Sequence, residues 1–293
     1  MPADDTLVSI GLPVRNGEQF LAGAVRSVLA QDHHHLELVI SDNASDDGTQ
    51  EICREFAQSD PRVRYYRQSE NIGLLNNFIR VQELAAGTYF KWLGDDDWLA
   101  PTYVSRCMEI FAENAPMILV TTQQAYVDSA GEQQTARYAG DRLGSAQPVA
   151  RFTEMLRLLN ESYLLLDPLY GLMRRAQVVK VPRVNMLRED ETFAAKLALV
   201  GPFGHIPEVL SYRRTRPFTR LPQLAGRLGV PAWHVRIATA LQCRELLKYI
   251  RETGLSPEER RQARIAVARM YFRRHRRTAV RRSRKLIALT VGS

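Results

Sequence analysis

Residues 36–49 have the sequence LELVISDNASDDGT, and this stretch decides the class of fold that we expect. Leu36 to Ile40 form an apolar run with the length of a buried strand, and the polar residues Asp42 and Asn43 follow its end. Residues 45–49 then form a turn that can cap a helix over residues 50–58. A buried strand, a polar loop and a helix in this order make one strand–helix unit of an α/β protein.

The same unit recurs on both sides of this stretch. Runs that predict strands alternate with amphipathic runs that predict helices, and Pro13 is expected to end the ladder of the first strand. The strands are predicted at residues 7–12, 36–40, 63–66, 89–93 and 117–127, and the helices at 20–30, 50–58, 74–86 and after Pro101. This alternation predicts a mostly parallel central sheet with flanking helices.

The pattern is weaker after Gly131. Helices are expected near residues 151–160 and 190–200, a strand near 205–213, and helical structure from Trp233 onward with a break at 254–257. We therefore divide the chain into an α/β domain over residues 1–220 and a helical, basic C-terminal region over residues 221–293.

The net positive charge of the chain comes from that C-terminal region. The 293 residues carry a net charge of +8, but residues 244–285 contain fifteen Lys and Arg against four Asp and Glu. This segment therefore carries +11 and the rest of the chain about −3. The high isoelectric point thus describes one segment and does not imply a nucleic-acid function for the whole protein.

The location of the protein is expected to be cytoplasmic. The N-terminal residues are acidic, no apolar leader follows them, and no apolar run reaches the roughly 18 residues of a membrane-spanning helix. The three cysteines lie far apart, and an odd number fits a reducing compartment better than a disulfide framework.

Polar clusters follow three of the predicted strands, and they are the candidates for a ligand site. The clusters are Arg15-Asn16, Asp42-Asn43 and Asp95-Asp96-Asp97. Sheets of this class bind ligands at the carboxyl ends of their strands. Three adjacent carboxylates repel one another and need a compensating cation, and oxygen ligands suit Mg²⁺ or Mn²⁺. The alternative is a solvated acidic turn.

Two further segments have simple structural explanations as well as functional ones. Asp42 at a strand end can accept hydrogen bonds from a base or a ribose, whereas Ser45 or Asp46 can simply cap the next helix. The segment with Asn71, Gly73 and Asn77 places amides at a helix start, where capping by Asn71 alone would suffice.

Taken together and in this order, these segments resemble the family 2 glycosyltransferases. The resemblance implies the GT-A fold, whose α/β sheet includes a Rossmann-like nucleotide-binding half. The resemblance covers roughly residues 7–213. The segments that carry it are Pro13 to Asn16, Gln31 with Glu37 to Thr49, Asn71 to Gly73 with Asn77, Gly94 to Asp97, Leu169 to Arg174, and Glu189-Asp190 with Leu197 and Gly201.

The resemblance implies a role for each matching residue. The backbone near Pro13, Val14 and Arg15 and the side chain of Asp42 would hold the nucleobase. Asp96 would be the main metal ligand, and Asp190, preceded by Glu189, would be the catalytic base. The remaining implied residues are Asn16, Asn71, Gly73, Asn77 and Asp95 for the donor nucleotide and Asp97 for the metal.

The sequence departs from the family pattern at two places. Many members have an Asp where Gly94 stands, which leaves the register of the acidic motif open by one residue. Many also have a His shortly after the position of Tyr212-Arg213, whereas this chain has Arg214, Thr215 and Arg216. We therefore expect fewer protein ligands for the metal and an Arg beside the diphosphate.

The implied function is a metal-dependent, inverting glycosyltransferase that uses Mn²⁺ or Mg²⁺. It would move a hexose from a UDP- or dTDP-sugar to an acceptor hydroxyl, in polysaccharide, cell-envelope or secondary-metabolite glycoside synthesis. A sugar nucleotidyltransferase stays open, although residues 13–17 are a poor version of its Gly-rich basic loop. A non-catalytic nucleotide-sugar-binding protein also stays open, although the chain retains both Asp96 and Asp190. An acidic helix start is the structural alternative for Glu189, Asp190 and Glu191, of which Asp190 is the preferred base.

The basic segment Glu258–Lys285 is expected to form a helix with Ile265, Ala268 and Phe272 on one stripe. Basic amphipathic helices lie on anionic membrane surfaces, so peripheral contact with the inner membrane face is our hypothesis. The alternatives are a solvated helix packed on the catalytic domain and an oligomer contact such as a dimer. Nucleic-acid binding is not expected, because the run lacks aromatic residues beyond Tyr271 and Phe272.

Overall fold

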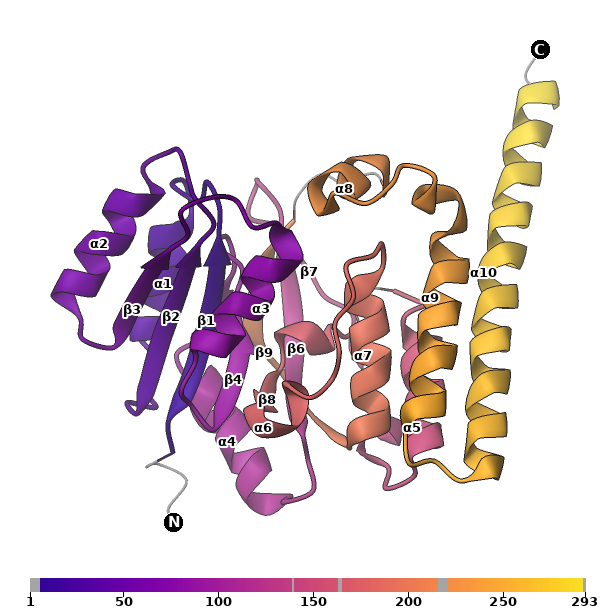
Figure 1. The fold of residues 1–293 in the computed structure, drawn as a ribbon, viewed down its shortest axis with the longest axis horizontal. Helices are drawn as coiled ribbons and strands as arrows, with labels where there is room; N and C mark the ends of the chain where they lie inside the picture. The colour runs from indigo at the N-terminus through magenta and orange to yellow at the C-terminus, as the bar shows by residue number, and fades with distance from the viewer. Residues whose placement is uncertain (1–5, 139, 163–164, 216–220, 292–293) are drawn as a thin grey trace.

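The computed structural model describes residues 6–138, 140–162, 165–215 and 221–291. Its centre is one sheet with the strand order β3-β2-β1-β4-β8-β6-β9-β5, in which β7 pairs with β6 (Figure 1). The long ladders β3-β2-β1-β4 and β6-β9 are parallel, and each antiparallel ladder joins only two residue pairs. The predicted α/β class with a mostly parallel sheet is confirmed.

The first half of the chain forms the predicted strand–helix units. Its elements are β1 (Val8–Val14), α1 (Leu21–Leu29), β2 (Leu36–Asp42), α2 (Thr49–Ser59), β3 (Val63–Arg67), α3 (Leu74–Leu84) and β4 (Tyr89–Trp92). Successive side chains of a strand point to opposite faces of the sheet. Leu38 and Ile40 accordingly pack in one apolar core and Val39 in the other, so both faces are covered.

The expectation that Pro13 ends the ladder of β1 was wrong. Pro13 pairs with Ser41, and β1 continues to Val14. The pairing of β1 with β4 ends at Gly11, whose carbonyl accepts a hydrogen bond from Leu93. The nitrogen of Pro13 faces the β4 side of β1, two residues beyond the end of this pairing. The hydrogen bond that a proline nitrogen cannot donate is therefore not required at this position.

The second half of the chain completes the sheet and places helices on it. Its strands are β5 (Trp98–Leu99), β6 (Leu119–Val127), β7 (Gln133–Gln134), β8 (Leu172–Arg174) and β9 (Phe203–Arg214). Its helices are α4 (Tyr103–Glu113), α5 (Pro148–Leu158), α6 (Arg175–Val178) and α7 (Glu189–Val200), with the short helices η2 (Arg142–Gly144) and η3 (Pro168–Tyr170). The expected strand and the two expected helices are therefore present.

The C-terminal region is helical, as expected, and shares its core with the sheet. It comprises α8 (Leu221–Leu228), α9 (His234–Glu252) and α10 (Pro257–Val291). One apolar cluster contains residues of β4 and α7 together with Leu246 of α9 and Val267 of α10. Figure 1 shows α9 and α10 side by side, with α10 extending past the body of the molecule. The proposed boundary at residue 220 falls in a stretch outside the described residues.

None of the helices in the described ranges carries the apolar length that crossing a bilayer requires.

Candidate active site

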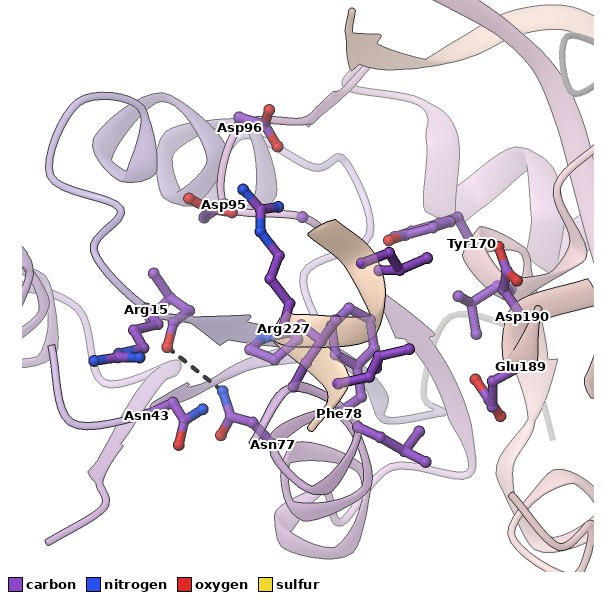
Figure 2. Close-up of a pocket in the computed structure, with 18 of the residues that line it drawn as sticks. Arg15, Asn43, Asn77, Phe78, Asp95, Asp96, Tyr170, Glu189, Asp190 and Arg227 are labelled. Atoms are coloured by element: carbon purple, nitrogen blue, oxygen red, sulfur yellow. Dashed lines mark hydrogen bonds between the residues drawn. The ribbon is translucent and has the colours of Figure 1, made fainter. Parts of the chain in front are cut away.

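A large pocket lies at the carboxyl ends of β1, β2 and β4 (Figure 2). Its volume is about 1000 Å³, which is large enough for a nucleotide-sized ligand. The loops after these strands, η3, the segment before α7, and α8 contribute its walls. Except for Asp42 and Gly73, all of the site residues predicted from the sequence line it: Pro13, Val14, Arg15, Asn16, Asn71, Asn77, Asp95, Asp96, Asp97, Glu189 and Asp190.

Hydrogen bonds join the loop after β1 to the loop after β2. The Asn16 amide N–H donates to the Ser45 hydroxyl over 3.0 Å, and the Asp46 N–H donates to the Asn16 side-chain oxygen over 3.1 Å. The Gly17 N–H donates to Thr49 Oγ1 over 2.9 Å. Asn16 has a φ of 58°, a left-handed conformation that non-glycine residues adopt rarely and mainly where the surroundings impose it. These contacts hold the backbone at residues 13–16 in one position at the pocket.

Asn43 joins the loop after β2 to the start of α3. Its side-chain nitrogen donates to Asn71 Oδ1 over 2.8 Å and to the Gly73 carbonyl over 3.3 Å. Its side-chain oxygen accepts the Ile72 N–H over 2.8 Å. Gly73 precedes α3 with φ 89° and ψ 159°, a region that is accessible to glycine alone. The Asn-x-Gly segment therefore shapes this side of the pocket, and Gly73 contributes its backbone.

Asp42 lies behind the pocket and is fully buried. One carboxylate oxygen accepts hydrogen bonds from the Ser45 N–H and hydroxyl, at 2.9 and 2.6 Å, and the other accepts one from the Tyr65 hydroxyl at 2.8 Å. The nearby Asn77, which does line the pocket, donates to the Ser41 carbonyl over 2.9 Å. The structure thus places the Asp42 side chain under the loop, where it organises the backbone around the nucleobase position predicted from the sequence.

The acidic turn after β4 divides into two parts. Figure 2 shows Asp95 and Asp96 at one side of the pocket. Asp97 is turned into the protein, where Arg213 Nε lies 3.4 Å from its carboxylate and the Arg214 N–H donates to it over 3.3 Å. Burial raises the pKa of the Asp97 carboxyl, and Arg213 opposes that rise. Asp97 therefore anchors the turn to β9.

The remaining carboxylates suit a hard divalent cation. Asp95 and Asp96 offer oxygen ligands alone, as Mg²⁺ and Mn²⁺ prefer. Within the described ranges, no three His, Cys, Asp or Glu side chains are grouped closely enough to enclose an ion. Such an ion would therefore depend on phosphate oxygens of a substrate for several of its ligands, which is how Mg²⁺ is commonly bound.

Two arginines add positive charge near this turn. Arg214 lines the pocket, and its guanidinium carbon lies 4.2 Å from the centre of the Phe20 ring and 5.7 Å from that of Trp98. Arg227 projects into the pocket from α8 (Figure 2). Arg214 is the arginine expected where the family often has a histidine, and Thr215 follows it without lining the pocket. Arg216 lies outside the described residues.

Three consecutive carboxylates begin α7, and the structure distinguishes them. Glu189 accepts two hydrogen bonds from Arg183, at 2.7 and 2.5 Å. Glu191 forms ion pairs with Arg188 at 2.8 Å and with Arg274 at 2.6 Å. Asp190 lines the pocket between them, and no arginine or lysine of the described chain lies within ion-pair distance of it. Of the three, Asp190 is the carboxylate that can accept a proton from a ligand.

The surroundings of Asp190 favour its protonated form. The dense protein around it, followed by the charges of Glu191 and Asp167, raises the pKa of this carboxyl from 3.8 to about 7. Its side chain is nevertheless exposed to the water of the pocket, which limits the cost of its charge. A carboxyl whose pKa is raised in this way suits a general base at neutral pH.

Several lining residues were not identified from the sequence. Arg183 and Arg188 precede α7, and their ion pairs with Glu189 and Glu191 place them on either side of Asp190. Phe78 follows Asn77 on α3. Arg227 lies in the segment assigned to a separate C-terminal region. The apolar spacing of Leu221, Leu224 and Leu228 signals the α8 helix, but nothing local signals that it lies over the pocket.

Residues 9–178 match the protein family described as glycosyl transferase family 2. Glycosyltransferase GlyA of Streptococcus pneumoniae serotype 4 is 30% identical over 134 residues, and chondroitin synthase of Escherichia coli is 33% identical over 126 residues. Each match covers 43% of this chain and 18% of the relative. This chain therefore spans about a fifth of the length of these two relatives.

Solved structures show the same fold. TarS residues 1–349 of S. aureus, in complex with UDP, has a TM-score of 0.62 and 14% identity, covering 88% of this chain and 69% of that chain. Mannosyltransferase PcManGT of Pyrobaculum calidifontis, in complex with GDP-Man and Mn²⁺, has a TM-score of 0.55 and 15% identity, covering 97% and 80%. The predicted GT-A fold is thus confirmed.

Proposed function

The chain belongs to glycosyl transferase family 2, and from this premise we propose that it transfers a sugar from a nucleotide-diphosphate sugar to an acceptor hydroxyl. The observation that carries the proposal is one pocket with two chemically different sides. Asp95 and Asp96 lie at one side, and Asp190 lies at the other (Figure 2). The first side suits a diphosphate with a cation, and the second suits a hydroxyl that must lose a proton.

The donor nucleotide would lie on the loops after β1 and β2. The backbone at Pro13 to Arg15 would contact the base, and Asn43, Asn71 and Asn77 offer side-chain amides beside it. TarS has been solved with UDP and with UDP-GlcNAc, and PcManGT with GDP-Man, which supports a sugar nucleotide as the ligand of this pocket. We propose a UDP- or dTDP-sugar as the donor.

The diphosphate would lie at the acidic turn. Mn²⁺ or Mg²⁺, held mainly by Asp96 with Asp95 beside it, would supply charge neutralisation for the leaving diphosphate. Asp97 would support the turn from behind through Arg213. Arg214 would face the diphosphate, because stacking between Phe20 and Trp98 keeps its charge in place at this side of the pocket.

The transfer would be a single displacement with inversion. The bond between the anomeric carbon and the diphosphate oxygen breaks, and its electron pair leaves with the nucleoside diphosphate. The acceptor oxygen forms the new bond from the opposite face, and its proton passes to the carboxylate of Asp190. The ion pairs of Glu189 and Glu191 with arginines keep those neighbours from competing for that proton.

We propose that the protein meets its acceptor at a membrane surface, on the basis of the side chains that α10 exposes. α10 carries two exposed apolar side chains, Ile265, which is 41% exposed, and Phe272, which is 69% exposed. Exposed arginines surround them, namely Arg261, Arg264, Arg269, Arg273 and Arg276. No Asp or Glu occurs after Glu259 in the sequence. An apolar stripe bordered by cations complements an anionic lipid surface, so we propose that α10 lies against one.

The experiment that tests the proposed function screens nucleotide sugars with and without Mn²⁺. Thermal stabilisation would report donor binding, and release of the nucleoside diphosphate would report transfer or slow hydrolysis. A nucleotidyltransferase would instead require a nucleoside triphosphate and release pyrophosphate. A non-catalytic binding protein would be stabilised without any release. Absence of both stabilisation and release across the panel would refute the proposal.

Asp96→Asn tests the metal assignment. We expect this protein to lose the Mn²⁺-dependent part of its nucleotide affinity in calorimetry, because the amide is a weaker ligand for a hard cation. Asp141→Asn is the matched control, since this exposed residue removes the same charge away from the pocket. Equal Mn²⁺ dependence in both variants would reject Asp96 as the ligand.

A further inference from the structure

The C-terminal helix α10 contacts the helix that carries the proposed base. Arg274 of α10 is largely buried, with 12% of its side chain exposed. Its Nη2 lies 2.6 Å from Glu191 Oε2, and its Nη1 donates to Gln242 Oε1 over 2.8 Å. Its Nε donates to Asn160 Oδ1 over 2.7 Å. One guanidinium thus joins α10, α9 and the end of α5 to the first turn of α7.

Glu191 is the centre of this contact. Its Oε1 accepts a hydrogen bond from Arg188 over 2.8 Å, and the fully buried Gln242 donates to its Oε2 over 3.2 Å. Arg188 has a φ of 65° immediately before α7, so the chain enters this helix in an uncommon conformation. Such a conformation persists where surrounding contacts impose it. The two arginines that bind Glu191 supply such contacts.

We propose that Arg274 is a positioning residue for the transfer reaction, which acts through Glu191 to orient Asp190 and keep it able to accept a proton. This inference rests on the proposed function, in which Asp190 is the base. It assigns part of the catalytic apparatus to residue 274, far beyond the segment 9–178 that matches the family.

The charges around Asp190 explain why one distant arginine matters. Glu191 is the charged group that most raises the pKa of Asp190. Without Arg274, Glu191 would keep Arg188 as its single arginine partner among the described residues, and its negative charge would act more strongly on Asp190. The other charged or titratable groups facing Asp190 are Asp167, which pairs with Arg213, Glu189, which pairs with Arg183, and the hydroxyl of Tyr170. Loss of Arg274 would leave these groups and their ion pairs unchanged.

The loss of Arg274 should leave the fold intact. Lys196 in the next turns of α7 contacts Glu245 of α9 at 2.7 Å, and apolar residues of α7, α9 and α10 share one core. The docking of α7 therefore has support that is independent of Arg274. A substitution at this residue would act mainly on the first turn of the helix.

The test compares Arg274→Gln with Arg244→Gln in the full chain. Both remove one positive charge from the C-terminal helices, but the side chain of Arg244, on α9, is exposed. Hydrogen exchange of residues 186–195, measured without substrates, reports the order of the first turn of α7. The pH profile of kcat reports the ionisation of the base. Arg274→Lys restores the charge without the planar guanidinium that donates to Asn160, Leu159, Gln242 and Glu191 at once.

We expect faster exchange in Arg274→Gln, an acidic limb of kcat moved to higher pH, and roughly tenfold lower kcat at pH 6, as misplacement of a reacting group can produce. The KM for the donor should stay unchanged, Arg274→Lys should be intermediate, and Arg244→Gln should match the wild type. Unchanged exchange, or an unchanged pH profile in an active protein, would overturn the proposal.

Asp190→Asn, assayed in parallel, separates the two possible failures. A fully active Asp190→Asn protein would refute the proposed base itself. An inactive Asp190→Asn protein beside an Arg274→Gln protein with wild-type exchange and pH profile would refute the role of Arg274 alone.

Discussion

Asp190 differs from its two neighbours at the scale of single residues, because arginines pair with Glu189 and Glu191 but not, among the described residues, with Asp190. We expect Asp190→Asn to bind donor normally and to lower kcat by about 10²–10⁴-fold, since an amide cannot take the acceptor proton. Donor affinity by calorimetry and turnover by nucleoside diphosphate release are the measurements. A normal rate would show that Asp190 is not the base, and Glu189 and Glu191 would then be the candidates.

The raised pKa of Asp190 predicts how the rate depends on pH. The base must be ionised, so kcat should rise with pH and level off above about 7, because the surroundings of Asp190 raise the pKa of this carboxyl to about 7. A rate–pH profile at saturating donor would measure this limb. A profile that is flat from pH 5 to pH 8 would exclude a base with a raised pKa.

The raised pKa of Asp190 also predicts that the folded protein becomes less stable as the pH rises. The folded state holds the Asp190 proton more tightly than the unfolded state, so between pH 3.8 and about 7 this group makes the protein less stable as pH rises. Asp190→Asn should therefore raise Tm at pH 8 relative to the wild type and change it less at pH 4. This comparison tests the environment of Asp190 without any activity assay.

At the scale of elements, the loops after the strands determine the shape of the nucleotide side. Within the described ranges, the non-glycine residues with positive φ are Asn16, Ala44 and Arg188, and each lies in or beside a loop that borders the pocket. Uncommon backbone conformations concentrate where a ligand site needs them. The rigid sheet beneath supplies the contacts that maintain these loops.

Gly73→Ala tests this loop geometry. The backbone at φ 89° and ψ 159° is accessible to glycine alone, so alanine should destabilise the protein by about 1–3 kcal/mol. It should also weaken nucleotide binding, because Gly73 accepts a hydrogen bond from Asn43. Gly23→Ala is the control, since Gly23 lies in α1 with open space around it and alanine favours a helix. Equal urea unfolding and nucleotide affinity in the two variants would contradict the prediction.

At the scale of the whole molecule, the C-terminal helices complete both the core and the pocket. Ala263, Val267 and Met270 of α10 are buried against α5 and α9. Arg227 of α8 lines the pocket. Removal of the chain after Gly254 would uncover this core, so a membrane test needs substitutions on the outward face of α10.

Arg269→Gln with Arg276→Gln tests membrane contact in the full chain. The wild type should sediment with anionic vesicles at low salt and be released at high salt. Two lost cations should weaken the partition by about 2 kcal/mol, or roughly thirtyfold. Arg54→Gln with Arg80→Gln removes the same charge from α2 and α3, where both residues are exposed, and should sediment like the wild type. Equal sedimentation of both double variants would exclude α10 as the contact.

The sequence by itself determined the order of strands and helices in the first half and the positions of the polar clusters. Both depend on local properties, since apolar periodicity follows the geometry of strand and helix, and loops follow strand ends. It also supported the GT-A fold, because several motifs occur in one order. It could not show that Pro13 remains in the ladder of β1, since that depends on where the neighbouring strand ends.

The tertiary structure alone decided which carboxylates can act. Glu189, Asp190 and Glu191 are equivalent in a helical pattern, and their difference comes from Arg183, Arg188 and the distant Arg274. In the same way, Asp97 is distinguished from Asp96 by Arg213 of β9. The charge state and direction of a carboxylate depend on which cations lie within a few ångströms of it. Arg183 and Arg188 come from the segment just before α7, whereas Arg274 and Arg213 are far away in the chain. Only the packing of α10 near the start of α7, and of β9 beside the acidic turn, brings these two distant arginines to the carboxylates.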